Sequence, residues 1–384
     1  MTESAQERPS QSAARVPLAP PWRTETERAQ AAAVPCGRVV VTCSAELGLG
    51  GLGRHFKEVV HALERAEQPT VCLSGSTRES AARARRRTPG LPDPARLLSA
   101  LPIPLSRGLR TRAMMVEFDA YAAGHLPDAD HLIAFNGQAL AQFREARRRR
   151  YESLSLISAN SHLRRVARQH AKAHRQYPLE QSWTTHLVKR NLTEYGLADR
   201  IYVASEYTRE SFLEAGFRDE LLSRFQLTPD PRYRPDDRPK PTETFNIVYV
   251  GRLSVDKGVP LLVDAVRSLP HADMRLVLVG GWATRGMRRF IQTACAEDSR
   301  ISSRPGDPLP HLRAASLYVH PSYEDGFAYA PAEALACGVP LIVSEDTGMK
   351  DLIDPPHGLI LPTGDLGALS EAIDAAHRRE ILVG

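Results

Sequence analysis

The sequence predicts an α/β fold made of two domains, each built around a parallel sheet. The second half alternates short apolar strands with helices, which is typical of a parallel sheet covered by helices on both faces. At 384 residues, the chain is long enough for two domains that each bury a core. Two of its apolar strands end in charged, glycine-containing turns, at the position where open α/β sheets bind ligands.

The first domain is expected over residues 37–227. Residues 1–36 are rich in Pro, Ala, Ser and Gln without apolar periodicity, so we expect a disordered tail. The expected elements are strand 38–43, a glycine-rich turn at 48–53, helix 56–64, and strands 70–75, 131–135, 154–159 and 200–204. Ser205 is expected to cap the helix that follows the last of these strands.

An interdomain linker is expected over residues 228–244, because its five prolines could not enter a sheet interior. The second domain then covers residues 245–384. Its expected elements are 245–250, 261–269, 274–279, 285–296, 301–303, 309–315, 316–320, 331–337, 340–343 and 349–353, taken as alternating strands and helices.

Composition indicates a globular protein of a reducing compartment. No apolar run approaches the ~20 residues that span a bilayer, and no apolar secretory core is found near the N-terminus, so we expect a cytoplasmic location. The five cysteines have neither metal-site nor disulfide-framework spacing, so we expect free thiols.

The net charge of +5 is unevenly distributed, with +10 over residues 1–240 and −5 over residues 241–384. A basic first domain could attract an acidic acceptor or allow weak peripheral association with an anionic membrane. The simpler interpretation is a set of solubilising arginines from a GC-rich bacterial genome. For the basic run Arg147–Arg150, a solvent-exposed helix face is likewise the preferred interpretation, and a binding surface for an acidic acceptor is the alternative.

One motif runs from His320 to Ser344 and is expected to form a strand, a loop and a helix. Pro331 suits the first turn of that helix, where its missing N–H is harmless. The loop amides and the positive end of the helix dipole together favour an anion such as phosphate. Glu333, on the first turns of the helix, could accept hydrogen bonds from the two hydroxyls of a ribose.

A second motif follows the apolar strand at residues 245–250. Gly251 ends this strand, and Arg252 and Lys257 flank the short turn after it. Two cations at the carboxyl end of a parallel strand could neutralise a diphosphate leaving group.

Together, these two motifs resemble the donor half of glycosyltransferase family 4, a group of retaining enzymes with the GT-B architecture. The resemblance extends over roughly residues 38–384 and implies two Rossmann-like domains whose parallel sheets face each other across a cleft. It implies that Arg252 and Lys257 hold the donor diphosphate and that Glu333 holds the ribose. It also implies that the acidic residue before Gly326 and Phe327 touches the sugar.

This chain departs from the family pattern at two positions of the loop. The family usually has Glu directly before Gly-Phe, whereas here Asp325 occupies that place and Glu324 precedes it. Either carboxylate could meet the sugar. Ala328 replaces the usual Gly after Phe, which restricts the backbone of the loop. The loop residues expected to face the donor are Glu324, Asp325, Gly326, Phe327, Ala328, Tyr329 and Ala330.

The resemblance implies further contacts from both domains. In the first domain, Gly50 and Gly51 would lie near the donor phosphate, and Asn136 would end a strand at the cleft. His162 would lie near the donor sugar, although a helix-start histidine that makes a cap is nearly as good an interpretation. In the second domain, Gly280, Ser303 and Arg304 would approach the base.

Other function classes are less well supported by the sequence. The Asp128-Ala-Asp130 pair has the spacing of a metal site, but it precedes a strand and is better explained as a turn, so we expect no metal. The arginines of residues 78–94 lack interleaved aromatic residues, so we expect a surface loop and no nucleic-acid partner. The glycine-rich turn partly resembles a dinucleotide site, but no acidic residue ends the second strand.

The sequence therefore predicts a metal-independent, retaining glycosyltransferase without a cofactor. Its donor would be a nucleoside-diphosphate sugar, with UDP or GDP favoured, and its acceptor would be a small or acidic molecule. The alternatives are a catalytically silent sugar-nucleotide-binding subunit and a GT-B nucleotide-sugar epimerase. Family members normally end in a helix that returns to the first domain. The chain stops at Gly384, so we expect either a truncated chain or a looser hinge.

Overall fold

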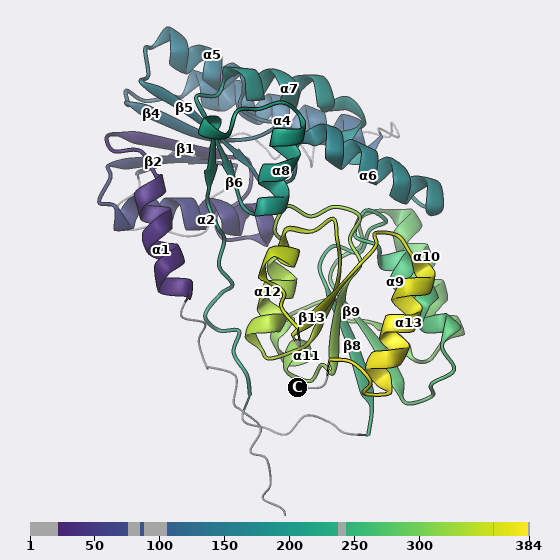
Figure 1. The fold of residues 1–384 in the computed structure, drawn as a ribbon. Coiled ribbons are helices and arrows are strands. Elements are labelled where there is room, and N and C mark those ends of the chain that lie inside the picture. Colours follow the sequence, from purple (N-terminus) through teal and green to yellow (C-terminus); the bar gives the residue numbers. More distant parts are fainter. Residues whose placement is uncertain (1–21, 76–84, 88–105, 237–242, 356, 383–384) are drawn as a thin grey trace, which may run out of the picture.

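A computed structural model of the chain describes residues 22–75, 85–87, 106–236, 243–355 and 357–382 (Figure 1). It contains a seven-stranded sheet of order β3-β2-β1-β4-β5-β6-β7 and a six-stranded sheet of order β10-β9-β8-β11-β12-β13. Every strand pair in both sheets is parallel. The predicted α/β class with two Rossmann-like domains is therefore confirmed.

The N-terminal domain surrounds its sheet with helices. Its strands are β1 (Val39–Cys43), β2 (Thr70–Ser74), β3 (Arg85–Arg87), β4 (His131–Phe135), β5 (Ser153–Ser158), β6 (Arg200–Val203) and β7 (Leu222–Arg224). Its α-helices are α1 (Trp22–Ala33), α2 (Gly50–Arg65), α4 (Arg107–Gly124), α5 (Leu140–Arg148), α6 (Leu163–Gln176), α7 (Val188–Leu197) and α8 (Glu206–Glu214), with short 3-10 turns at Trp183–His186 and Asp219–Leu221. Strands β1 and β4 are buried along their whole length, as expected for a sheet covered on both faces.

The C-terminal domain repeats this arrangement on a smaller scale. Its strands are β8 (Phe245–Val250), β9 (Met274–Val279), β10 (Ile301–Ser303), β11 (Leu317–His320), β12 (Leu341–Ser344) and β13 (Gly358–Leu361). Its helices are α9 (Val259–Ser268), α10 (Arg285–Glu297), α11 (Leu309–Arg313), α12 (Tyr329–Ala336) and α13 (Leu366–His377), with a 3-10 turn at Gly348–Leu352. The strand order reverses between β8 and β11, and such a switch point is where open α/β sheets bind ligands.

The expected N-terminal tail differs from the structure in part. Residues 22–33 form α1, which packs on α2, whereas residues 1–21 lie outside the described residues. Two hydrogen bonds of Gln30 hold the helix in place. Its side-chain amide donates to the Glu58 carboxylate at 2.9 Å and to the Gln226 carbonyl at 2.7 Å. Apolar periodicity could not reveal a helix that is held in this way.

Two further segments differ from expectation. Of the glycines expected to form a turn, Gly48 lies in the turn before α2, whereas Gly50, Gly51 and Gly53 lie inside the helix. A Cβ on Gly53 would approach the Glu46 carbonyl oxygen to 2.0 Å. Close packing of the helix start on the preceding loop therefore requires glycine at this position. Residues 85–87, expected in a surface loop, form the edge strand β3, while the rest of that loop lies outside the described residues.

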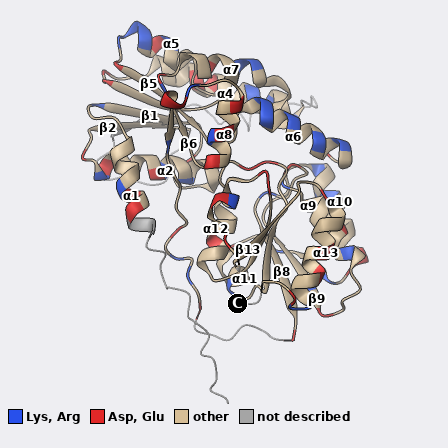
Figure 2. Cartoon of the chain, viewed as in Figure 1, with Lys and Arg blue, Asp and Glu red and all other residues tan. Residues whose placement is uncertain are grey.

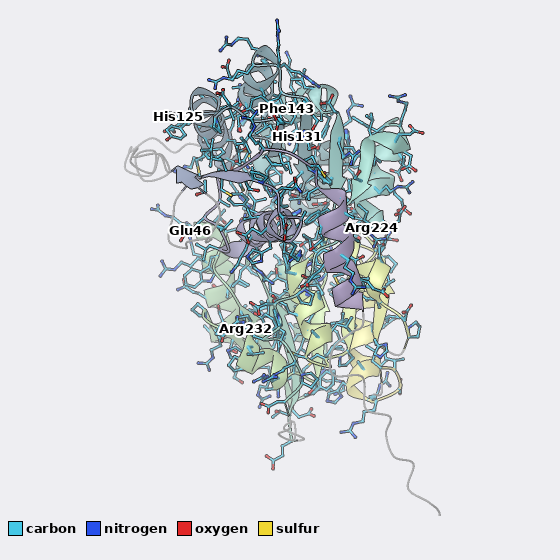
Figure 3. The ribbon with its side chains drawn as sticks, turned by 90° about the vertical axis from the view of Figure 1, so that its left-hand side faces the viewer. Glu46, His125, His131, Phe143, Arg224 and Arg232 are labelled. Carbon is cyan, nitrogen blue, oxygen red and sulfur yellow. The ribbon has the colours of Figure 1, made fainter. Side chains whose placement is uncertain are left out.

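The two domains lie against each other, and α6, α8 and α12 line their junction (Figure 1). One apolar cluster contains buried residues of both domains, including Ala204, Phe327 and Met349. The linker contacts the C-terminal domain through Arg232, which is labelled in Figure 3. The Arg232 guanidinium pairs with the Asp307 carboxylate at 3.0 Å. Lys and Arg residues gather on α5 and α6 of the N-terminal domain (Figure 2). Within the described ranges, we find no helix of the length and apolarity that a membrane crossing requires.

Candidate functional site

A pocket of 490 Å³ opens at the carboxyl ends of β8, β9 and β10. Its wall contains two cations and no carboxylate, and four of its residues are glycines. The full lining is Arg107, Val250, Gly251, Arg252, Val279, Gly280, Gly281, Trp282, Ala283, Gly306 and Pro308. Gly280 has φ +152°, and a Cβ there would lie 1.8 Å from the Gly251 carbonyl oxygen, so only glycine fits. The result is a positively charged hollow whose backbone a ligand can approach closely.

The two cations predicted from the sequence differ in their surroundings. The exposed Arg252 side chain lies on the pocket wall and has no hydrogen bond or ion pair within the described part of the chain. The Lys257 ammonium donates to the Glu324 carbonyl at 2.9 Å and to the Asp325 carboxylate at 2.7 Å. An ammonium has three donors, so Lys257 keeps one for a ligand. Burial lowers the pKa of Lys257, but the surrounding carboxylates of Asp325, Glu324 and Asp256 outweigh it and keep the group charged.

The two neighbouring acids of the loop face different partners. The fully buried Glu324 carboxylate accepts hydrogen bonds from the Asn160 amide at 3.0 Å and the Ser161 backbone N–H at 2.9 Å, both in the N-terminal domain. Asp325 instead pairs with Lys257, and its carboxylate lies 3.4 Å from His320 Nε2. Burial would raise the pKa of Asp325, but the charges of Lys257 and His320 lower it overall. Glu324 therefore joins the domains, while Asp325 orients the lysine.

The loop after these acids is tightly constrained. A Cβ on Gly326 would lie 2.3 Å from the Ala159 carbonyl, and the Gly326 carbonyl accepts a hydrogen bond from Thr208 Oγ1 at 3.0 Å. Ala328, the N-cap residue of α12, has φ +66°, a conformation that favours glycine. Pro331 lies in the first turn of α12, as predicted. Phe327 and Ala328 are buried, and Phe327 packs edge-on against Tyr329.

Glu333 lies on α12 as predicted and forms an ion pair across the domain junction. Its carboxylate is 2% exposed and contacts the Arg54 guanidinium of α2. Arg54 also lies 4.1 Å above the Tyr329 ring, whose hydroxyl donates to Glu58 at 2.6 Å. Burial raises the pKa of Glu333, with Arg54 opposing this effect. Arg54 therefore occupies one oxygen of this carboxylate, and a ribose diol would have to share the carboxylate with Arg54 or replace it.

Two of the residues predicted in the N-terminal domain do not face the pocket. The ring of His162 is buried among Tyr195, Phe212 and Phe217 at centroid distances of 5.0 to 5.7 Å, and it makes no cap hydrogen bond. The side chain of Asn136 forms hydrogen bonds with two residues of α7. Its amide donates to the Glu194 carboxylate at 3.0 Å, and its oxygen accepts from the Tyr195 hydroxyl at 3.0 Å. Both side chains therefore stabilise the domain in this state.

The other predicted contacts are placed as follows. Gly50 and Gly51 are exposed at the first turn of α2, and a Cβ on either would have no neighbour within 4 Å. Ser303 ends β10 and Arg304 follows it, close in sequence to the pocket residues Gly306 and Pro308. Of all the predicted site residues, Arg252 and Gly280 line the pocket itself. Asp130 of the suspected metal pair accepts from the Arg38 backbone N–H at 2.8 Å, and no metal-like cluster occurs in the described ranges.

Among the pocket residues that sequence reasoning missed, two have large side chains, Arg107 and Trp282. Arg107 is the first residue of α4 and directly follows the N-cap Ser106 in the sequence. The Ser106 hydroxyl accepts a hydrogen bond from the Leu109 N–H. Trp282 is 41% exposed and carries Arg288 over its ring at 5.2 Å. The capping serine could have located the helix start. No local signal links Arg107 to a pocket formed more than 140 residues later in the chain.

The comparisons with known proteins agree with this geometry. Residues 244–378 match the family model of glycosyl transferases group 1. The C-terminal domain of this chain is similar to the group 1 glycosyltransferases. The matched segment contains both sequence motifs, the pocket glycines and all predicted donor contacts outside the N-terminal domain.

Curated relatives match only part of the chain. A GDP-mannose-dependent alpha-mannosyltransferase of Mycobacterium tuberculosis is 29% identical over 205 residues, covering 48% of this chain and 47% of the relative. An O-antigen chain mannosyltransferase B of Escherichia coli is 30% identical over 33% of this chain and 35% of its own length. The chain thus spans about half the length of the first relative and about a third of the second.

Solved structures match over both domains. Sucrose-phosphate synthase from Thermosynechococcus elongatus superposes with a TM-score of 0.65 at 20% identity, covering 89% of this chain and 90% of that one. WaaG, a glycosyltransferase of lipopolysaccharide biosynthesis, gives a TM-score of 0.64 at 14% identity, with coverage of 90% and 91%. Anabaena HepE in complex with UDP-glucose gives 0.62 at 16% identity, covering 90% of each chain. These likenesses establish that the two domains have the GT-B arrangement.

Proposed function

We propose that the chain is a retaining glycosyltransferase that moves a sugar from a nucleoside-diphosphate sugar to an acceptor held by the N-terminal domain. The observation that carries this proposal is the cationic, glycine-lined pocket at the carboxyl ends of β8, β9 and β10, in the domain that matches the group 1 glycosyltransferases. Strand β8 is one of the two strands that flank the switch point. Two cations and exposed backbone amides at such a place match the charge of a diphosphate.

The proposed chemistry relies on stabilising the leaving group. As the bond between the anomeric carbon and the diphosphate breaks, negative charge accumulates on the leaving oxygen and is balanced by Arg252 and by the remaining donor of Lys257. The acceptor hydroxyl then forms the new bond on the face that the diphosphate leaves, and its proton passes to a diphosphate oxygen. This route needs no protein nucleophile, and the cations supply the charge that a metal ion would otherwise provide.

The donor nucleotide remains a choice between a few bases. One relative is named for GDP-mannose, and several structural neighbours were solved with UDP or UDP-glucose. We therefore propose UDP or GDP. The basic helices of the N-terminal domain favour an acidic acceptor, and we propose that the acceptor is a small or acidic molecule. We also propose that the enzyme is cytoplasmic.

The deciding experiment compares turnover in Arg252→Ala and Lys257→Ala with that of Arg267→Ala. The first two variants should lower turnover by ~100-fold or more, because removal of one charge-stabilising donor typically costs ~100–1000-fold. Arg267 pairs with Glu297 on the surface, both partly exposed, so its removal should leave turnover within about twofold. Near-wild-type turnover in both Arg252→Ala and Lys257→Ala would refute the diphosphate assignment.

A catalytically silent binding subunit is the second candidate. The observation that favours it is the Glu333–Arg54 ion pair, which occupies the carboxylate proposed for the ribose. Incubation of the purified chain with UDP-glucose and GDP-mannose distinguishes the two. A transferase releases free sugar slowly by donor hydrolysis, whereas a silent subunit binds the nucleotide and releases none.

A further inference from the structure

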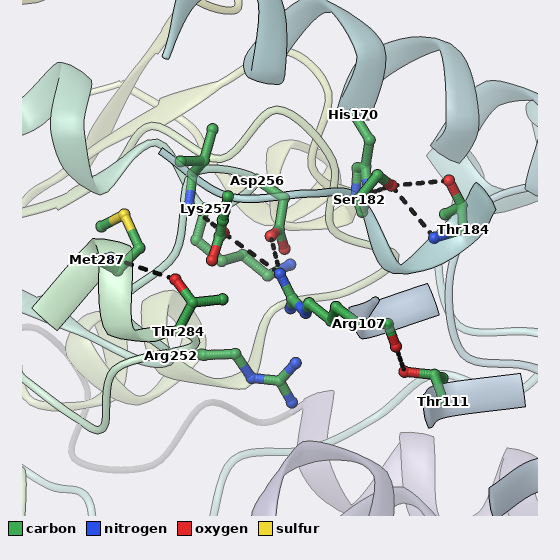
Figure 4. Close-up of polar contacts among 12 residues, drawn as sticks. Arg107, Thr111, His170, Ser182, Thr184, Arg252, Asp256, Lys257, Thr284 and Met287 are labelled. Carbon is green, nitrogen blue, oxygen red and sulfur yellow. Dashed lines mark hydrogen bonds and ion pairs between the residues drawn. The ribbon is translucent and has the colours of Figure 1, made fainter. Parts of the chain in front are cut away.

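Arg107 reaches from the N-terminal domain to the pocket of the C-terminal domain. It is the first residue of α4, yet its side chain forms part of the same wall as Arg252. Figure 4 shows the side chains of Arg107 and Arg252 extending toward each other from different elements. The cleft therefore receives one cation from each domain.

Two buried carboxylates hold Arg107 in this position. Its Nη1 lies 3.3 Å from Glu180 Oε1 and 3.4 Å from Asp256 Oδ1. The side chains of Glu180 and Asp256 are 0% and 5% exposed. Burial would raise the pKa of Asp256, but the charges of His170 and Arg107 lower it overall, so it stays ionised. Both contacts use the same terminal nitrogen of the guanidinium.

The other terminal nitrogen has no acceptor. Arg107 Nη2 is buried and lacks a hydrogen-bond partner among the described residues. Buried polar groups are nearly always hydrogen-bonded, and an unpaired one costs free energy, so this nitrogen is an unexplained donor. The pocket wall beside it contains no carboxylate, and Arg252 on the same wall is also unpaired within the described ranges. The hollow thus has on its wall the unpaired guanidinium of Arg252 and a second guanidinium, that of Arg107, with one terminal nitrogen unpaired.

We propose that Arg107 is a third cationic contact for the donor diphosphate, supplied by the N-terminal domain. A phosphate oxygen in the pocket would accept from the free side of the guanidinium, while Glu180 and Asp256 keep the other side fixed. The donor would then bridge the domains, with Arg252 and Lys257 on one side and Arg107 on the other. Donor binding would favour the closed arrangement, because the site is complete only there. This inference rests on the proposed function.

The test measures binding of UDP and GDP, and of uridine and guanosine, by calorimetry. The proteins are the full chain and its variants Arg107→Ala, Arg107→Lys, Arg252→Ala and Arg110→Ala. Arg110 is exposed one turn further along α4 and serves as the matched control. Arg107→Ala should weaken binding of the preferred diphosphate about tenfold or more, because the loss of one hydrogen bond to a charged group typically lowers affinity by that much. Binding of the parent nucleoside should change by less than about threefold, which separates a phosphate contact from general damage to the site.

Arg107→Lys covers the case in which removal of the cation prevents folding. It keeps the charge beside Glu180 and Asp256 but loses the planar fork, so it should fold normally and still bind the diphosphate several-fold more weakly. Wild-type diphosphate affinity in every folded Arg107 variant, with weakened binding in Arg252→Ala, would overturn the role of Arg107 and leave the proposed function intact. Equal weakening of diphosphate and nucleoside would also overturn it, since a structural tie predicts that result. Failure of the wild-type chain to bind either diphosphate would refute the proposed function itself.

Discussion

Ala328 holds a backbone conformation that costs free energy in a residue with a Cβ. Its φ is +66°, at the start of α12 and within the loop that faces the domain junction. A left-handed conformation costs an L-residue about 1–2 kcal/mol, which the surrounding contacts must offset. The loop is therefore strained at the residue that replaces the family's usual glycine.

Replacing Ala328 with glycine should relieve this strain. We expect the free energy of unfolding to rise by about 1 kcal/mol, because relief of the positive φ outweighs the greater chain entropy of glycine when unfolded. Urea unfolding measures the change. The control is Ala171→Gly on the exposed side of α6, which should lose about 1 kcal/mol of stability. A loss of similar size in both variants would show that Ala328 is not strained.

His162 should make the fold sensitive to acid rather than take part in turnover. Burial, followed by the nearby charges of Arg164 and Arg165, lowers its pKa to about 4 from the ordinary 6.5. Between these values the unfolded chain binds more protons than the folded one. Its contribution is therefore fully present above pH 6.5 and is lost as the pH falls toward 4.

His162→Phe removes this titration, and it suits an aromatic cluster in which the ring nitrogen Nε2 has no partner among the described residues. We expect the variant to lose roughly 1–2 kcal/mol less stability than the wild type between pH 7 and pH 5, measured by urea unfolding. Turnover at pH 7.5 should stay within about threefold. The control is the exposed His125 replaced by Gln, whose turnover at pH 7.5 should equal that of the wild type. A large fall in turnover for His162→Phe would restore the sugar-contact interpretation.

At the scale of elements, apolar runs predicted the C-terminal strands well. The strands expected at 245–250, 274–279 and 301–303 have the bounds of β8, β9 and β10. The first two runs are mostly apolar, have buried residues and are followed by glycine, so local pattern and burial agree. The third run, Ile-Ser-Ser, has one buried residue and is followed by Arg304. The last strand and helix, β13 and α13, were not expected, although they complete the same alternation.

Elements held by distant polar contacts could not be predicted in this way. Helix α1 lacks an apolar stripe, and its position depends on contacts of Gln30 with Glu58 and with Gln226, 196 residues away. The site has the same limitation. Its motifs located Arg252, Lys257 and Glu333 within one domain. The residues that contact this domain from the other one were not located: Arg107 pairs with Asp256, Arg54 with Glu333, and Asn160 with Glu324. Pairings across two domains leave no spacing signal in a single sequence.

At the scale of the whole molecule, function depends on how closely the domains approach. One close approach is at Gly326, where the backbone of the loop meets the backbone of Ala159 and Asn160 and no side chain can adjust. The buried Glu324 beside it ties the loop to Asn160 and Ser161, and Gln169 of α6 donates to Asp346 at 2.8 Å nearby. These contacts hold the pocket and the cation from α4 in one arrangement. A change that separates the domains should therefore weaken catalysis without touching any charged group.

Gly326→Ala tests this dependence, because its methyl group would lie about 2.3 Å from the Ala159 carbonyl and must push the domains apart. We expect a larger radius of gyration by X-ray scattering, together with a fall in turnover of about tenfold or more, since a displacement of ~1 Å can cost ~100-fold. The control is Gly196→Ala in α7, where a Cβ meets nothing within 4 Å and helix propensity improves, so shape and turnover should be unchanged. Full turnover and unchanged scattering in Gly326→Ala would mean that the domains tolerate separation. The closed arrangement would then not be the one that performs the transfer.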